Sequence, residues 1–309
     1  MAKAVRYDRY GELDVLEVRD VPRPRPASGE VVVAVTAAGI NPGESMIRRG
    51  LLHDRWPATF PEGEGSDLAG VVVEVGSGAT DFAVGDEVMG FSLTRSSHAE
   101  YTRVPTGQLA PKPAGVPWEV AGSLYTAGAA AYAAVRSVAL GAGDVVAVSG
   151  ASGGVGTIAV QLAKHTGATV LGIAGPDNDA WLADRGVTPV NYGDDLAGRL
   201  RTASPTGRVD AFLDLFGGGY VELAVDDLGI APERVDTIID FAAVERFGVK
   251  VEGTAAASSA AVVAELAELV ATGRLEVPIA GVFPLDQVRE AYRTLEQRHT
   301  RGKLVLSMR

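Results

Sequence analysis

The stretch that decides the fold is Asp144–Gly156, which reads DVVAVSGASGGVG. Its first part, Val145–Val148, is a short run of apolar residues typical of a buried strand. Its second part, Gly150–Gly156, is rich in glycine and precedes a predicted helix with Ile158 and Leu162 on its apolar face. A strand, a tight turn without Cβ atoms and an exposed helix N-terminus together form a pyrophosphate site. The stretch therefore predicts a dinucleotide-binding βα unit.

The glycine spacing in this turn is G-x-x-G-x-x-G rather than the commoner G-x-G-x-x-G. A P-loop is excluded because no Gly-Lys-Ser/Thr ending follows, and the remaining alternative is a tight turn without function. Glycine lets the backbone approach the phosphates and lets the helix pack closely on the strand. The cofactor contacts predicted here are Ser152, Gly153, Gly154 and Val155, with Ala174 at the end of the next strand.

The strand after the turn, Thr169–Ala174, leaves the choice between NAD and NADP open. An NAD site usually has an acidic residue at the end of this strand to hold the ribose hydroxyls. Here the strand ends without an acid, which favours the 2′-phosphate of NADP. No Arg or Lys follows either, because the next residues are Pro176-Asp177-Asn178-Asp179.

Hydrophobic periodicity divides the chain into a β-rich head, an α/β middle and a short tail. The head contains the predicted strands Val31–Val35, Gly70–Val75 and Glu87–Phe91. From about residue 121, helices alternate with strands, which predicts a parallel sheet. These strands are Val145–Val148, Thr169–Ala174, Asp210–Leu215, Val235–Ile239 and Val249–Glu252. A helix over 258–272, a last helix capped by Asp286 and ending at Gln297, and the strand Lys303–Leu306 follow. We expect one domain from 1–121 with 275–309, and a second from 122–274.

Composition narrows the function classes. The chain has 309 residues, a formal net charge of −11 and no cysteine. The acidic balance argues against a nucleic-acid partner, which needs a basic patch. The missing cysteine excludes disulfides and thiolate metal sites. The N-terminus lacks the apolar core of a signal peptide, and apolar runs such as Val31–Val35 are too short to span a bilayer. We expect a cytoplasmic protein with no membrane partner.

Three stretches resemble the medium-chain dehydrogenase/reductase superfamily, specifically its zinc-free quinone oxidoreductase branch, the zeta-crystallin-like family. They are Ala38–Pro42 with Arg48 and Gly50 downstream, Gly65–Val88, and Gly150–Gly156, and the tail Gly302–Leu306 resembles the closing strand of the family. The likeness covers essentially the whole chain. It implies an α/β fold: a Rossmann doubly wound parallel sheet plus a β-rich GroES-like catalytic domain.

The resemblance also implies that no zinc is bound. Asn41 stands where zinc members have a cysteine, and Gly65-Ser66-Asp67 stands where they have Gly-His-Glu. Both replacements are poor zinc ligands. Members of this branch typically transfer a hydride from NADPH to a quinone or to the β-carbon of an α,β-unsaturated carbonyl (enone). The negative charge then spreads over a conjugated system, so hydrogen-bond donors suffice to stabilise it.

Two residues match family positions near the nicotinamide and are our candidate catalytic residues. Asn41 could donate its amide to the substrate oxygen or to the cofactor ribose, and Thr126 could bond the nicotinamide or its ribose. The alternatives are a turn residue before Pro42 and an ordinary helix-start residue. Met46 replaces a tyrosine of many quinone oxidoreductases, which questions quinone itself as the substrate.

Four further residues are expected near the cofactor. Tyr192 matches a family tyrosine near the adenosine phosphate, and Lys303 would add positive charge there. Phe216, in Phe216-Gly217-Gly218 after a strand, is expected to open the nicotinamide cleft. Phe241 follows the next strand end, where an aromatic ring is equally consistent with a place in the core, and Tyr192 is equally consistent with packing at its strand end. Asp179 stands where some relatives have a lysine for the 2′-phosphate, and a carboxylate there repels that phosphate unless it points away. We expect NADP(H), with NAD(H) as the alternative.

Other readings of the sequence are weaker. No tyrosine is followed four residues later by lysine, which excludes a short-chain dehydrogenase. No Gly-x-Ser-x-Gly stands at a strand-to-helix turn, which argues against an acyl hydrolase. The rival from another class is a non-catalytic dinucleotide-binding sensor or crystallin-like protein of the same fold. By analogy with relatives we expect a homodimer, with Phe247–Glu252 as a plausible edge strand.

Overall fold

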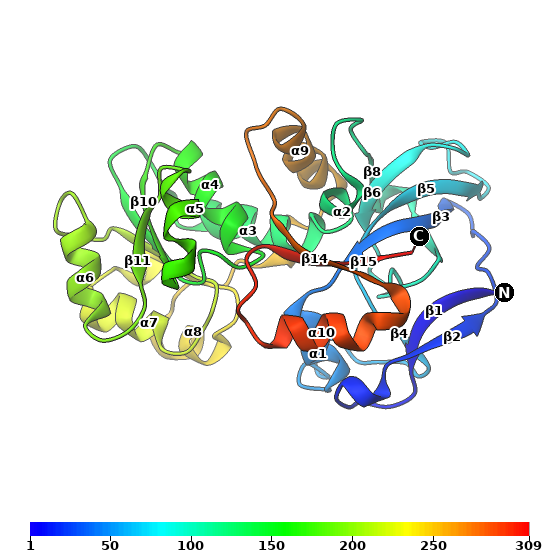
Figure 1. Ribbon diagram of the computed structural model, residues 1–309, viewed down its shortest axis with the longest axis horizontal. Helices are drawn as coiled ribbons and strands as arrows, with labels where there is room; N and C mark the ends of the chain where they lie inside the picture. Colours follow the sequence, from blue (N-terminus) through cyan, green and yellow to red (C-terminus); the bar gives the residue numbers. More distant parts are fainter. Residues whose placement is uncertain (309) are drawn as a thin grey trace. The chain divides into compact units, whose positions relative to one another are not determined.

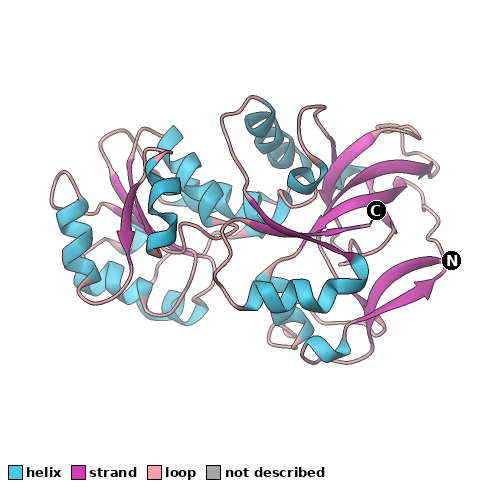
Figure 2. Ribbon diagram, viewed as in Figure 1, coloured by secondary structure: helices cyan, strands magenta, loops and turns pink. Residues whose placement is uncertain are grey.

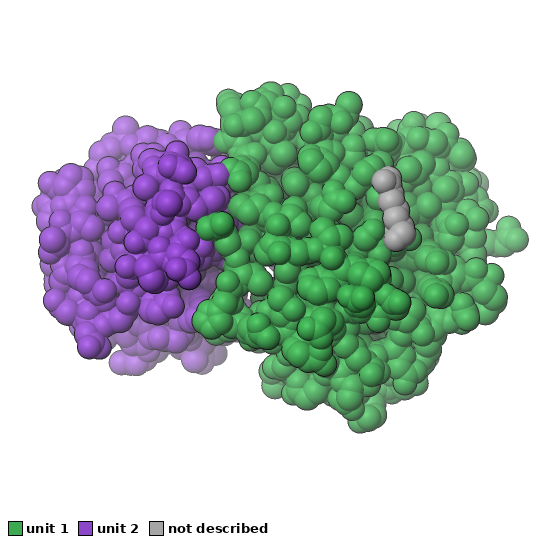
Figure 3. Space-filling model, in the orientation of Figure 1, with its two compact units in different colours: residues 1–126, 259–309 green, residues 127–258 purple. Residues whose placement is uncertain are grey.

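The computed structural model describes residues 1–308 and divides into two compact units (Figure 3). Unit 1 contains residues 1–126 and 259–308, so the C-terminal part of the chain returns to the N-terminal unit. Unit 2 is the continuous segment Ala127–Ser258. Unit 1 carries the β-rich part of the chain and unit 2 the alternating α/β part.

Unit 2 is built on a parallel sheet with the strand order β11-β10-β9-β12-β13 (Figure 1). The strands are β9 (Val145–Val148), β10 (Thr169–Ala174), β11 (Thr188–Asn191), β12 (Ala211–Asp214) and β13 (Val235–Thr237). All residues of β9 and β12 are buried. The chain reverses its direction of winding at β9, and ligands bind parallel sheets at such a switch point. The predicted Rossmann sheet is confirmed.

Helices flank this sheet (Figure 2). They are α3 (Tyr125–Ser137), which starts at the end of unit 1, and α4 (Gly156–His165), α5 (Asp179–Ala183), α6 (Leu196–Ala203), α7 (Tyr220–Glu222) and α8 (Phe241–Phe247). Helix α4 ends at His165 with Thr166 as its C-cap, and Gly167 follows with φ +87°, a conformation that favours glycine. One core of unit 2 joins Leu171 and Phe212 of the sheet to Leu200 of α6 and Val221 of α7.

Unit 1 contains two sheets, the larger with the order β14-β15-β3-β5-β6-β8 and with β7 also paired to β3. Its strands are β3 (Glu30–Gly39), β5 (Asp67–Val75), β6 (Glu87–Phe91), β7 (Tyr101–Pro105), β8 (Leu109–Pro111), β14 (Ile279–Pro284) and β15 (Lys303–Ser307). The smaller sheet has the order β2-β1-β4, from Glu17–Val21, Ala2–Tyr7 and Glu62–Gly63. The tail strand β15 pairs antiparallel with β3, which brings strands from both chain segments of unit 1 into one sheet.

The helices of unit 1 are α1 (Pro42–Arg48), α2 (Trp118–Ala121), α9 (Ala260–Ala271) and α10 (Val288–Glu296). Ser259 caps α9, because its side chain accepts a hydrogen bond from the Val262 N–H at 3.2 Å. Helix α9 contacts β6 and β8 and therefore belongs to unit 1. The sequence placed this helix with the nucleotide-binding domain because it follows the last strand of that domain in the chain.

Two local predictions were wrong. The segment Val249–Glu252 forms no strand and makes only an isolated bridge between Lys250 and Asp236. The reason is that the Glu252 N–H donates to the Asp236 carboxylate at 2.8 Å, so a side chain takes the place of the next ladder bond. Asp286 is not a helix cap, because it lies inside a 3-10 turn, Leu285–Gln287, that leads into α10.

Candidate functional site

The glycine turn of unit 2 has a backbone that a side chain would disrupt. Gly150 has φ +60°, and its carbonyl accepts the Gly153 N–H at 2.9 Å. A Cβ on Gly156 would lie 2.0 Å from the same carbonyl oxygen. The Ala151 N–H donates to the Ile173 carbonyl at 3.1 Å and ties the turn to β10. The Thr157 N–H already donates to the Gly153 carbonyl at 2.9 Å and the Ile158 N–H to the Val155 carbonyl at 3.1 Å, so an anion would be bound by the N–H groups that precede them in the turn. The predicted contacts Ser152, Gly153, Gly154 and Val155 all lie in this turn.

One buried carboxylate, Asp214, joins the ends of three strands. Its Oδ1 accepts hydrogen bonds from the Ser149 hydroxyl at 2.7 Å and from the N–H groups of Phe216 at 3.1 Å and Gly217 at 2.9 Å. Its Oδ2 accepts the Thr237 hydroxyl at 2.8 Å. Because Asp214 is fully buried, these bonds are shielded from water and hold β9, β12 and β13 in register. The arrangement positions Phe216 at the end of β12.

Three exposed aromatic residues follow the carboxyl ends of successive strands. Tyr192, Phe216 and Phe241 are 57%, 38% and 40% exposed and follow β11, β12 and β13. The glycine turn follows β9, and Ala174 ends β10. Since carboxyl ends of parallel strands share one edge of a sheet, all the predicted cofactor residues of unit 2 lie at the same edge. Exposed aromatic rings at that edge suit a ligand better than a place in the core.

The acidic residue Asp179 is held by a neighbour at this edge. Its carboxylate accepts a hydrogen bond at 2.8 Å from the side-chain amide of Asn191, the last residue of β11. The Tyr192 hydroxyl lies beside Gly175, where it would be 3.3 Å from an added Cβ. The carboxylate is thus tied to β11 and already has one donor.

Unit 1 holds a buried polar group that we call the Asp67 cluster: Asn41, Glu44, Asp67, Thr126 and Lys303. Asp67 begins β5, is fully buried and accepts three hydrogen bonds. The donors are the Thr126 N–H at 2.7 Å, the Thr126 hydroxyl at 2.5 Å and the Asn41 amide at 3.1 Å. The Lys303 ammonium lies 3.6 Å from the second carboxylate oxygen. The two predicted catalytic residues are therefore brought together by one carboxylate that the sequence had not singled out.

Asn41 caps α1, and its side chain is fully used within the cluster. Its amide nitrogen donates to Glu44 at 3.2 Å and to Asp67, while its carbonyl oxygen accepts from the Lys303 ammonium at 2.5 Å. An asparagine amide has two hydrogens to donate, and both face carboxylates here. This geometry favours a positioning role over the predicted donation to a substrate oxygen.

Lys303, expected near the adenosine phosphate, has its ammonium buried in unit 1. It is 4% exposed and also donates to the Ile40 carbonyl at 3.2 Å. With Asn41 and Asp67 as further partners, its donors are taken up inside the cluster. The ammonium therefore acts as the counter-charge of Asp67 in this structure, and its contact with the cofactor stays a prediction.

A second layer of charges surrounds the cluster. Glu44 accepts the Tyr292 hydroxyl at 2.7 Å, and the fully buried Arg48 pairs with Glu64 at 2.9 Å. Burial raises the pKa of Glu64 to about 8, and Arg48 opposes the rise. Burial likewise raises the pKa of Asp67. The charge of Lys303 and the hydrogen bonds from Thr126 oppose this rise. Every buried charge here thus has a partner, as the low polarity of the interior requires.

Sequence reasoning missed the carboxylates that organise both places. Asp67 opens the apolar strand β5, and Asp214 ends the buried strand β12. A single acid at the end of an apolar run is the available signal, since a buried acid must have partners. Those partners could not be named, because Lys303 lies 236 positions beyond Asp67 and Ser149 lies 65 before Asp214.

Two family models match the chain. The alcohol dehydrogenase GroES-like domain matches residues 27–137, and a zinc-binding dehydrogenase model matches residues 188–306. A solved quinone oxidoreductase from Coxiella burnetii superposes with a TM-score of 0.88 at 30% identity, over 100% of this chain and 99% of that one. The chain belongs to the quinone oxidoreductase branch of the medium-chain dehydrogenases/reductases. Both the GroES-like and Rossmann parts of the predicted fold are thereby confirmed.

Curated members of the branch align over different lengths. The rat quinone oxidoreductase is 36% identical over 182 residues, which are 57% of this chain and 54% of the relative. The chain thus spans about half the length of the mammalian relatives that it matches. Quinone oxidoreductase 1 of Escherichia coli is 26% identical over 99% of both chains.

Two features of residues 1–308 concern metals and membranes. No group of three or more His, Asp or Glu side chains in this part of the chain is arranged to hold a metal ion. None of its helices has the length and apolar character needed to cross a bilayer.

Proposed function

We propose that this chain is an NAD(P)H-dependent oxidoreductase that transfers a hydride to a quinone or to an α,β-unsaturated carbonyl. The observation that carries the proposal is the glycine turn Gly150–Gly156 at the switch point of a parallel sheet, in a chain of the quinone oxidoreductase branch. A Cβ on Gly156 would collide with the turn, so this position needs glycine. A turn that binds a pyrophosphate through its backbone requires such residues without a Cβ. The residues present therefore fit a dinucleotide.

In the proposed reaction each unit has a definite part. When bound, NAD(P)H supplies the hydride. The turn and the N-terminus of α4 bind its phosphates, and Phe216 and Phe241 offer apolar surface at the same strand edge. In unit 1, the Thr126 hydroxyl donates its hydrogen to Asp67, so toward the cofactor that oxygen would act as a hydrogen-bond acceptor. A half-buried Thr126 held in this way suits a donor such as a carboxamide or a ribose hydroxyl.

The proposed reaction does not use zinc. The family position of a cysteine ligand holds Asn41, whose amide and carbonyl are bonded to Asp67 and Lys303. Ser66 stands at the position of the histidine ligand, and a neutral hydroxyl is a poor zinc ligand. Conjugated acceptors fit such a site, because the charge from the hydride is delocalised in the product.

For the cofactor we propose NADP(H), with NAD(H) as the alternative. No acid ends β10, so the usual contact with the ribose hydroxyls of NAD is missing there. The carboxylate of Asp179, which would oppose a phosphate, is bonded to Asn191. The exposed hydroxyl of Tyr192 is available as a donor at the same edge.

The remaining parts of the proposal concern partners and location. We propose a cytoplasmic homodimer that acts on small molecules and binds neither nucleic acid nor membrane, and the net charge of −11 supports the absence of nucleic acid. Sedimentation of the purified protein would test the dimer. A monomer at micromolar concentration would contradict it.

The function is tested by measuring NADPH and NADH oxidation against a panel of quinones and enones, with a chelator in every reaction. We expect acceptor-dependent oxidation of NADPH that the chelator leaves unchanged. Fluorescence titration of both nucleotides in parallel reports binding without turnover. A strong preference for NADH would contradict the cofactor assignment, and loss of activity with the chelator would contradict the zinc-free mechanism.

A further inference from the structure

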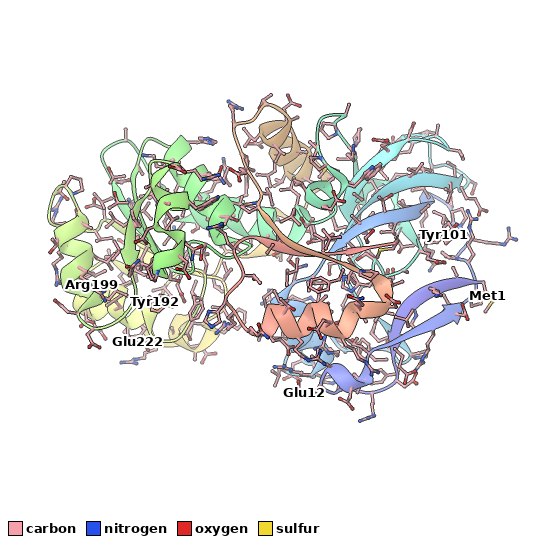
Figure 4. All side chains as sticks on the ribbon, in the orientation of Figure 1. Met1, Glu12, Tyr101, Tyr192, Arg199 and Glu222 are labelled. Carbon is pink, nitrogen blue, oxygen red and sulfur yellow. The ribbon has the colours of Figure 1, made fainter. Side chains whose placement is uncertain are left out.

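Arg199 carries an unsatisfied guanidinium at the nucleotide edge of unit 2. It lies in the first half of α6, the helix after β11, and its Nη2 would be 3.4 Å from a Cβ added to Gly193. Its Nε and Nη2 are buried and have no hydrogen-bond partner. Gly193 directly follows Tyr192, and Figure 4 labels Tyr192 and Arg199 in the same part of the unit. The guanidinium therefore lies beside the exposed tyrosine at the end of β11.

The acidic residues around Arg199 do not neutralise it. Asp195 uses its carboxylate to cap α6, where it accepts the Gly198 N–H at 3.2 Å. Asp179 is bonded to Asn191 instead. Asp194 is exposed and, like the other acids of residues 1–308, forms no ion pair with Arg199. The buried guanidinium nitrogens thus have no counter-charge in a region where several carboxylates could have supplied one.

Buried donors without partners are unfavourable and need an explanation. An unmet buried donor costs about 1–3 kcal/mol, and more when it is charged. Arg201, two residues further along α6, shows the usual solution, because its guanidinium donates to the Asp227 carbonyl. Arg199 has no such acceptor within the described chain. A ligand with anionic oxygens would satisfy both buried N–H groups at once, since the planar guanidinium fork matches a phosphate.

We propose that Arg199 binds the 2′-phosphate of NADP(H) and is the residue that makes the chain prefer NADP(H) to NAD(H). The inference rests on the proposed function, since it concerns the same dinucleotide. Residues 175–179 after β10 include two acidic side chains and no basic one, so in this proposal the positive charge comes from α6, beyond the next strand. In this proposal Arg199, beside Gly193, supplies the charged fork, and the Tyr192 hydroxyl, beside Gly175, supplies a neutral donor.

The test compares Arg199→Gln with wild type in equilibrium binding. Two ligand pairs differ only in the 2′-phosphate: NADPH with NADH, and adenosine 2′,5′-bisphosphate with 5′-AMP. We expect Arg199→Gln to weaken NADPH and the bisphosphate about 10–100-fold, the range for a lost charged contact, and to leave NADH and 5′-AMP within about twofold. Arg199→Lys keeps the positive charge but loses the planar pair of guanidinium donors, and it should retain part of the preference for the ligands that carry the 2′-phosphate.

Arg201→Gln is the matched control, because it removes one positive charge from the same helix. It should leave all four affinities within about twofold. Equal weakening of both members of each pair by Arg199→Gln, no weakening at all, or an equal effect of Arg201→Gln would each overturn the proposal. Should Arg199→Gln fail to fold, Arg199→Met is judged by the same criteria. Wild type that binds neither NADPH nor NADH would instead refute the proposed function, so the two failures are distinguishable.

Discussion

Removal of the Asp67 charge tests how the buried cluster of unit 1 is stabilised. Asp67 and Lys303 are 0% and 4% exposed, and their charged atoms are 3.6 Å apart. With an effective dielectric constant of about 20, Coulomb's law gives an attraction of about 4–5 kcal/mol at this distance. In Asp67→Asn the Lys303 ammonium stays buried without its counter-charge. We expect this variant to lower the free energy of unfolding of unit 1 by about 3–5 kcal/mol.

The double variant Asp67→Asn/Lys303→Met separates the ion pair from other effects. It removes the orphaned ammonium together with the carboxylate, and methionine fills much of the lysine volume with apolar atoms. Replacing both partners of a buried pair is far less costly than removing one. We therefore expect the double variant to be more stable than Asp67→Asn, with a coupling energy of at least about 2 kcal/mol between the two positions.

Urea unfolding followed by tryptophan fluorescence measures these energies in unit 1. The chain has three tryptophans, of which Trp56 and Trp118 lie in unit 1 and Trp181 in unit 2. A Trp181→Phe background leaves only the two reporters of unit 1. Two results would contradict a stabilising ion pair between Asp67 and Lys303. One is a loss below about 1 kcal/mol for Asp67→Asn, and the other is a double variant in which the costs of the two single variants simply add.

Three further predictions concern the turn, the candidate catalytic hydroxyl and a buried acid. Gly156→Ala puts a Cβ 2.0 Å from the Gly150 carbonyl and should weaken NADPH binding at least about tenfold by titration, whereas Gly141→Ala, with 3.9 Å of room, should not. Thr126→Val removes the hydroxyl and should lower kcat/KM for NADPH oxidation about tenfold, whereas Thr126→Ser keeps the hydroxyl and should lower it much less. Equal losses in the two variants would contradict a role of the hydroxyl. Burial raises the pKa of Asp236 to about 7, so its contribution to stability should fall from about pH 4 to pH 7. In a plot of melting temperature against pH, Asp236→Asn should reduce the fall between about pH 4 and pH 7. Parallel plots for the variant and wild type would contradict this role of Asp236.

The fold was predictable from the sequence where local patterns agree with the tertiary structure. The strands β6, β9 and β10 have the predicted bounds, because each is a short apolar run between turn residues. The prediction failed at Val249–Glu252, which has the composition of a strand. There the Asp236 side chain competes for a backbone N–H, and a contact between residues 16 positions apart is not visible in local composition.

The sequence allowed individual candidate site residues to be proposed, but not the hydrogen bonds and the ion pair that connect them. Asn41 and Thr126 were found through family positions; in the structure both bond to the buried Asp67 carboxylate, and their catalytic roles stay predictions. The carboxylate that joins them, Asp67, and its counter-ion Lys303 come together only when β15 pairs with β3. Arg199 gave no signal for a similar reason, because an arginine near the start of an amphipathic helix is ordinary in a sequence. Its missing partner becomes visible only in three dimensions.

The central claim is that this chain passes a hydride from a nicotinamide nucleotide to a conjugated acceptor without a metal. The most direct measurement is the rate of NADPH consumption with a panel of enones and quinones, in the presence of a chelator. We expect NADPH consumption that requires the acceptor, rises with the acceptor concentration and is unchanged by the chelator. Tight binding of NADPH without consumption by any acceptor would contradict it and would favour a non-catalytic dinucleotide-binding protein.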